Sequence, residues 1–181
     1  MLLREKNLHP VLGTALRWAL AITIAGFIPG VLMILPDRLQ DSITCYKQFD
    51  GHTVGFSEGG PGLPFLGWST VAGDLRIAHF VGIHALQIVP LVGLMIDAWL
   101  PKLPSSRQQM LVWVCSISYL FVIALLTWEA LSAESLFAPG HITIWVSWAI
   151  FAVASSLSAC VLWLPPPTFW KGNSSTDMAE S

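Results

Sequence analysis

Four long apolar runs divide the chain, and short polar segments separate them. A helix needs about 20 consecutive apolar residues to cross the hydrocarbon core of a bilayer. Each run approaches or exceeds that length, and the predicted spans cover residues 18–35, 77–100, 110–131 and 141–164. The pattern therefore predicts an all-α integral membrane protein, with a four-helix bundle as a single domain over residues 1–171.

Local signals mark where these helices begin and bend. Asp74 is an expected N-cap for the second span, and Pro139 is expected in the first turn of the fourth. Pro29 and Pro90 lie inside spans and predict kinks, because proline removes a backbone donor. The first run follows a basic start but is longer than a signal-peptide core, so we expect it to be a retained helix.

A long loop, residues 36–76, joins the first two spans on the outer side. Glycine and proline are frequent between residues 51 and 70, which predicts little regular structure there. Its apolar side chains predict a lid folded back over the end of the bundle, and these are Phe49, Phe56, Phe65, Leu66 and Trp68. The polar residues 172–181 predict a disordered tail.

Composition strengthens the membrane interpretation and excludes two other classes. Apolar residues make up 54% of the chain and charged residues only 11%, against about 25% in soluble domains. The net charge of −2 and the lack of a basic patch exclude a nucleic-acid partner. The three cysteines form no CxxC pair, so neither a disulfide framework nor a cysteine zinc site is expected.

Basic residues near the spans predict the orientation. They are more frequent beside the first span's start, between the second and third spans, and after the fourth. Under the positive-inside rule these flanks face the cytoplasm. We therefore expect a multi-pass protein of the bacterial inner membrane with both termini, and the tail, in the cytoplasm.

Ionisable side chains gather on the outer side of this predicted topology. His52 lies in the outer loop, whereas His79, His84 and His141 lie in the outer half of two spans. Glu129, near the outer end of the third span, joins the same layer. Ionisable groups inside membrane spans are rare and are candidates for function.

Helical spacing shows which of these histidines can share a helix face. His84 and Gln87 are three residues apart and share a face, whereas His79 and His84 diverge by about 140°. His79 is instead close in depth to His141, at the start of the fourth span. Two neutral imidazoles from different helices can hold a haem iron axially.

The haem hypothesis assigns roles to several residues. His79 and His141 would be the axial pair, His84 the alternative ligand, and Arg76 the partner of a haem propionate. Gly82 would let the flat macrocycle approach the backbone. A transition metal is the alternative cofactor, with the candidate ligands His79, His84, His141 and Glu129; His52 and Gln87 are further candidates.

Structural roles remain open for the same side chains. A histidine in a span can bond a carbonyl of a neighbouring helix, and His141 can be a solvated or capping residue. Glu129 can extend to the outer interface, and Arg76 can anchor beside lipid headgroups.

The motif Gly-His-Thr-Val-Gly, the following Gly/Pro-rich loop and the segment GDLRIAHFVGIHALQ span Gly51 to Gln87. This region resembles small, functionally uncharacterised bacterial inner-membrane proteins. The architecture is more loosely similar to haem-handling four-helix membrane units, such as each half of haem A synthase. The first resemblance implies a membrane location, and the second implies histidines that bind haem near the outer face.

Three function classes follow. The first is a membrane redox or cofactor-binding protein that holds haem b or a metal near the outer face. The second is a non-catalytic interaction or assembly subunit, and the third is a small proton-coupled carrier. Expected partners are the lipid bilayer and either a membrane redox partner or a second copy of the chain, while the sequence leaves enzymatic activity open.

Overall fold

A computed structural model of the 181-residue chain describes residues 9–35, 37–43, 49–56 and 60–163. Four long helices dominate it: α1 (Pro10–Met33), α3 (Leu75–Trp99), α4 (Ser105–Leu131) and α5 (His141–Trp163). A short helix, α2 (Asp37–Ile43), and three two-residue strands, β1 (Phe49–Asp50), β2 (Thr53–Val54) and β3 (Gly73–Asp74), complete it. Each long helix is long and apolar enough to cross a membrane, as the sequence predicted. The predicted tail lies outside the described residues.

The helix boundaries agree with the sequence at some ends and differ at others. Asp74 is the N-cap of α3, as expected, and its side chain accepts a hydrogen bond from the backbone N–H of Arg76. α1 begins at Pro10, earlier than residue 18, because proline suits the first helical position. The expectation for Pro139 was wrong, since α5 begins only at His141.

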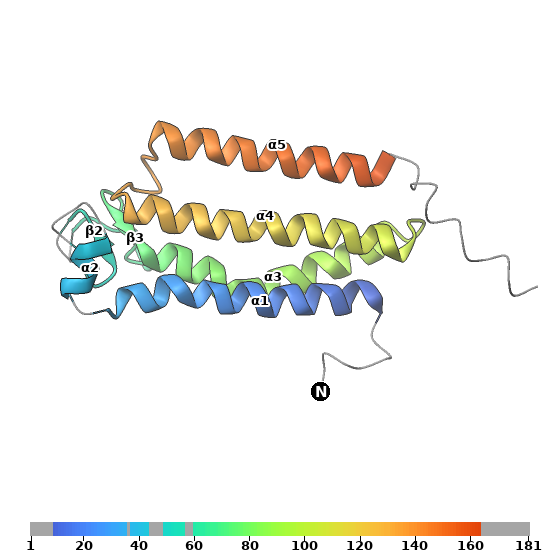
Figure 1. Ribbon diagram of the computed structural model, residues 1–181, viewed down its shortest axis with the longest axis horizontal. Helices are drawn as coiled ribbons and strands as arrows, with labels where there is room; N and C mark the ends of the chain where they lie inside the picture. The colour runs from blue at the N-terminus through green and yellow to red at the C-terminus, as the bar shows by residue number, and fades with distance from the viewer. Residues whose placement is uncertain (1–8, 36, 44–48, 57–59, 164–181) are drawn as a thin grey trace, which may run out of the picture.

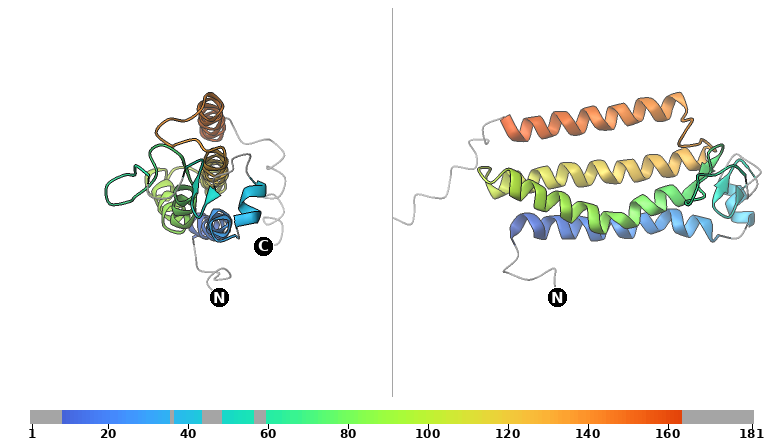
Figure 2. Two further views of the ribbon diagram at one scale, coloured as in Figure 1. Left: turned by 90° about the vertical axis from the view of Figure 1, so that its left-hand side faces the viewer. Right: turned by 180° about the vertical axis from the view of Figure 1, so that it is seen from behind.

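The long helices lie side by side and alternate in direction (Figure 1). α1, α3 and α4 pack against one another, whereas α5 packs mainly on α4. α1 and α5 consequently lie on opposite sides of α4 in both the side and end views (Figures 1 and 2). We call the end with α2, the strands and the start of α5 the cap end.

Small residues bring α1 and α3 into close contact. Gly26 of α1 faces Gly82 of α3 so closely that a Cβ atom on either would overlap the other's backbone. Farther along, Gly93 packs against Ala15. Such small-residue contacts let helix backbones approach without a side chain between them. Because Pro90 cannot donate to the carbonyl of Leu86, α3 then bends midway (Figure 2).

The cap end is more ordered than the sequence predicted. The strands form an antiparallel sheet in the order β1-β2-β3, with Thr53 opposite Asp74. The side chain of Gln40 in α2 donates to the last carbonyls of α1, those of Leu32 and Met33. These contacts supply partners for backbone groups that a helix end leaves unpaired.

The aromatic side chains of the outer loop form a lid only in part. Trp68 packs edge-on against Phe80 of α3, with ring centroids 5.4 Å apart. Phe65 and Leu66, by contrast, are exposed, as is Phe56. The described part of the predicted lid therefore covers the cap end of α3 and α4 through Trp68 and the strands.

Candidate functional site

His79 faces α1. Its Nδ1 lies 2.9 Å from the carbonyl oxygen of Gly26, and its ring packs over Gly30. The glycines make room for the imidazole, since a Cβ on Gly30 would lie 2.9 Å from Nδ1. This is the structural role that the sequence left open: a histidine bonded to a carbonyl of a neighbouring helix.

His84 bonds to its own helix. Its Nδ1 lies 2.8 Å from the carbonyl oxygen of Phe80, one turn earlier. The centroids of the Phe80 and His84 rings are 4.0 Å apart. Because Trp68 also packs on Phe80, the three rings form a continuous row. Gln87, one turn farther along, is exposed.

These bonds select one tautomer for both histidines. A carbonyl oxygen can only accept, so Nδ1 must carry the proton in His79 and in His84. The Nε2 atom of a neutral ring then presents a lone pair. Metal-ligating histidines commonly have this arrangement, with the other nitrogen donating to a backbone carbonyl.

The proposed axial pair is not brought together. His79 faces α1, whereas His141 is exposed at the start of α5, on the other side of α4. The backbone of Gly82, where a macrocycle was expected, is covered by Gly26 of α1. In the part of the chain that the structure describes, no three His, Cys, Asp or Glu side chains are placed to hold a metal ion.

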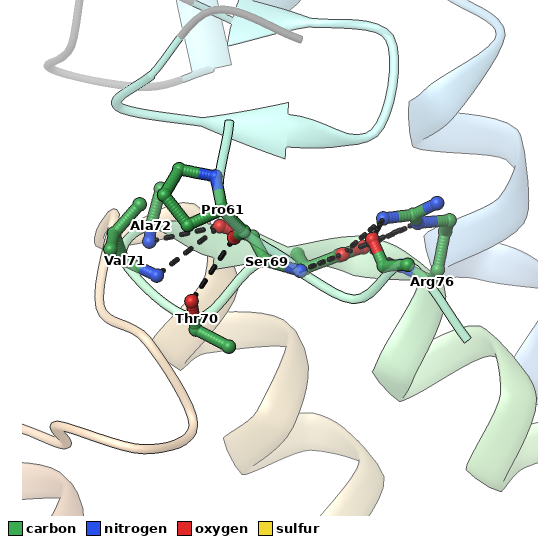
Figure 3. A network of polar contacts seen from close by, with 8 residues as sticks. Pro61, Ser69, Thr70, Val71, Ala72 and Arg76 are labelled. Atoms are coloured by element: carbon green, nitrogen blue, oxygen red, sulfur yellow. Dashed lines mark hydrogen bonds and ion pairs between the residues drawn. The ribbon is translucent and has the colours of Figure 1, made fainter. Parts of the chain in front are cut away.

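Arg76 and Ser69 belong to one polar network at the cap end (Figure 3), and both donate to the Asp74 carboxylate. The buried Asp74 carboxylate accepts from the Ser69 N–H and from Nε and a terminal nitrogen of Arg76. The same terminal nitrogen donates to the carbonyl of Gly67. The described contacts of the guanidinium are therefore with protein groups, while its role toward a propionate stays a prediction.

These bonds set the charge of Asp74. Burial acts to raise the pKa of its carboxyl, but the hydrogen bonds from Arg76 and Ser69 and the positive charge of Arg76 outweigh it, so the pKa lies below its ordinary value. His52 contributes to the same region through its backbone carbonyl, which accepts from the N–H of Leu75.

One unfilled space lies between α4 and α5, and we call it the α4–α5 groove. It has a volume of about 350 Å³, and its walls are mostly apolar. Its lining includes Ser118, Leu125 and Glu129 of α4 and Thr143, Ile150 and Ala154 of α5. A second, apolar groove of about 540 Å³ borders Trp113, Phe121 and Ala149 along the same pair of helices.

Glu129 is the chemically unusual residue of the groove. The residue lines the cavity, yet it is only 4% exposed. The buried Oε1 has no hydrogen-bond partner among the described residues. Buried polar groups are nearly always hydrogen-bonded, so an unpaired carboxylate oxygen calls for an explanation.

Glu134 and the hydroxyl groups near the groove do have partners. Oε2 of Glu134 accepts from the N–H of Gly140, at 2.9 Å, and from the hydroxyl of Thr143, at 2.6 Å, so Glu134 caps α5. The hydroxyls of Ser118 and Ser147 donate to carbonyls of their own helices. Their bonding contrasts with the unpaired oxygen of Glu129.

Sequence reasoning selected Glu129 but missed its surroundings. Thr143 and Ser147 are one helical turn apart and mark the face of α5 that lines the groove. This spacing was available in the sequence, although nothing in it indicated that α5 would turn that face toward Glu129.

No family model matches the chain, and no curated protein or solved structure shows significant similarity to it.

Proposed function

We propose that the chain is an integral membrane protein that binds a lipophilic small molecule in the α4–α5 groove. The observation that carries the proposal is the buried, unpaired Oε1 of Glu129, a residue that lines a mostly apolar cavity. Ligand sites are typically apolar cavities of about 300–1,000 Å³ with a few convergent polar groups. The α4–α5 groove has this volume and this character.

The exposed surface of α5 supports the membrane location. Trp145, Trp148 and Phe151 are 74%, 63% and 65% exposed, and Thr143 is the buried residue of this helix. In water, each exposed Å² of apolar surface costs about 25 cal/mol. A bilayer removes this cost, and it also gives a lipophilic ligand direct access to the groove from the side.

A photoreactive alkyl diazirine tests the proposed function. In nanodiscs, we expect saturable labelling of α4 and α5 residues that line the groove. Ala154→Phe should fill the groove and reduce this labelling at least about fivefold, because cavity-filling side chains occupy the ligand's volume. Ala152→Phe is the matched control, since Ala152 is exposed on the same helix and does not line the groove.

Labelling that rises linearly with probe and spreads evenly over exposed apolar residues, such as Ile24 and Ile28 of α1, would contradict the proposal. That pattern is expected from probe dissolved in lipid alone.

A second candidate function is cofactor binding, which the Nδ1–H tautomers of His79 and His84 favour. In that case Nε2 of His79 or His84 would bind haem b or a transition metal, and a residue of a second chain would be the other ligand. Protein expressed with ample haem and iron should then show a Soret band. His79→Ala or His84→Ala should change that band, whereas His9→Ala, at the opposite end of the helices, should not. A colourless, metal-free protein would exclude this candidate.

A further inference from the structure

We infer that the α4–α5 groove selects amphiphiles with a positively charged head group, which the carboxylate of Glu129 would contact. The inference rests on the proposed function and specifies the ligand of the same site. It requires that the head group lie at the cap end of the groove and that the apolar tail follow α4 and α5.

The ionisable side chains at and beside the groove are acidic. Glu129 lines it, and the neighbouring Glu134 acts on Glu129 electrostatically. The described lining residues include no lysine, arginine or histidine. His141 begins α5 but is exposed and lies outside the lining. A cationic head group would therefore complement the site, whereas an anionic head group would be repelled.

The bonding of the two carboxylates distinguishes their roles. Glu134 is engaged by Gly140 and Thr143, which holds it at the start of α5. Glu129 keeps an oxygen without a partner in an apolar setting. An isolated charge in such a setting is costly, and a charge-assisted hydrogen bond from a cation is among the strongest ways to offset the cost. Glu129 is thus the contact residue, and Glu134 adds negative potential.

The dimensions of the groove fit one alkyl tail. On α4 the lining extends from Glu129 back to Ser118, and on α5 from Thr143 forward to Ala154. Both stretches cover eleven residue steps, about 16 Å at 1.5 Å per residue. Because the helices run in opposite directions, Glu129 and Thr143 share one end of the groove, and Ser118 and Ala154 share the other. A decyl chain fits this length.

A series of decyl compounds separates charge from hydrogen bonding. Decyltrimethylammonium is a cation without an N–H donor, decylammonium is a cation with donors, decanol is a neutral donor, and decanoate is an anion. Each would compete with the photoreactive diazirine for the full-length protein in nanodiscs. We expect both cations to compete at least about tenfold more tightly than decanol, with decanoate weakest.

Variants assign the preference to Glu129. Glu129→Gln should reduce the advantage of the cations over decanol to less than about twofold, and Glu134→Gln should reduce it in part. Asp97→Asn is the control, because this carboxylate pairs with His9 at the opposite end of the helices. Circular dichroism confirms that each variant folds, and the wild-type series tests the inference even where a variant does not.

The outcomes are distinguishable. Decanol competing as well as the cations, or decanoate competing best, would overturn the inference while leaving a saturable site and the proposed function intact. A cation preference that survives in folded Glu129→Gln would overturn the assignment to Glu129. If the diazirine labels no saturable site, the proposed function and the inference both fail.

Discussion

The contact between α1 and α3 and the contact between α4 and α5 represent two extremes of packing in one chain. Gly26 and Gly82 let the backbones of α1 and α3 come into direct contact. His79 packs beside this contact and bonds to the Gly26 carbonyl of α1. The second pair leaves grooves of about 350 and 540 Å³ on its flanks. Glu129 keeps an unpaired oxygen beside the smaller one.

The difference shows that a polar residue in a predicted span does not by itself mark a ligand site. His79 is ionisable and lies inside a long apolar helix, yet its partner is a backbone carbonyl. Glu129 is also an ionisable residue inside a long apolar helix, but it lies beside the α4–α5 groove. Packing around the residue therefore decides which polar group is available to a ligand.

The largest expected effect comes from the close contact. Gly82→Leu should destabilise the protein by about 3 kcal/mol or more, because the new side chain would collide with the backbone of α1. Thermal unfolding in detergent, together with the amount of protein that reaches the membrane, measures this effect. Ala149→Leu, beside the larger groove, is the matched control and should cost less than about 1 kcal/mol. Equal losses from both variants would contradict the packing contrast.

Asp74→Ala should have the next largest effect, a loss of roughly 2–3 kcal/mol in the stability of the cap end. The substitution removes the N-cap of α3 and the charged hydrogen bonds of Arg76. Hydrogen exchange of the Ser69 and Arg76 amides reports this loss locally. Protection that remains unchanged would refute the role assigned to Asp74.

The same carboxylate predicts a pH effect. Because the pKa of Asp74 is lowered in the folded protein, its stabilisation is fully present above the unfolded value of about 3.9 and is lost as the pH falls through the folded value. Protection of the Ser69 amide should therefore decrease on acidification below about pH 4 in the wild type. Asp74→Asn should remove this dependence.

His79→Ala should cost about 1–2 kcal/mol, since it removes the bond to Gly26 and opens a small cavity against α1. His84→Ala should stay within about 0.5 kcal/mol, because His84 bonds only within its own helix in the described contacts. Unfolding midpoints of the two variants in the same detergent compare them directly. A larger loss for His84→Ala would reverse the assignment and favour a ligand or partner at that residue.

The last prediction concerns the start of α5, where the expected loss is smaller than that of Asp74→Ala. Glu134→Ala should cost about 1 kcal/mol, because Glu134 bonds the Gly140 N–H and the Thr143 hydroxyl as a cap does. Hydrogen exchange in the first turn of α5 measures this change. Glu129→Gln is the control, and it should leave that turn protected.

Much of the fold could be predicted from the sequence, because it depends on local patterns. Apolar length determined the four candidate spans, and the position of Asp74 before an apolar run correctly predicted an N-cap. The predicted first span began only after the basic start of the chain, whereas α1 extends back to Pro10. The strands of the cap end form only when separate segments of the loop pair with one another. The high glycine and proline content of the loop predicted no such strands.

The candidate site was predicted less completely. Spacing along α3 correctly indicated that His79 and His84 have different surroundings. Which helix each faces depends on how α1, α4 and α5 pack, and no single-helix pattern determines that. For the same reason, the sequence singled out Glu129 but gave no indication of the groove.

An experimental density map of the full chain in nanodiscs of native lipid tests the central claim most directly. We predict that an elongated non-protein density occupies the α4–α5 groove, with its head within hydrogen-bonding distance of Glu129. An empty groove, together with a Glu129 carboxylate that is bonded to a protein group, would contradict the proposal.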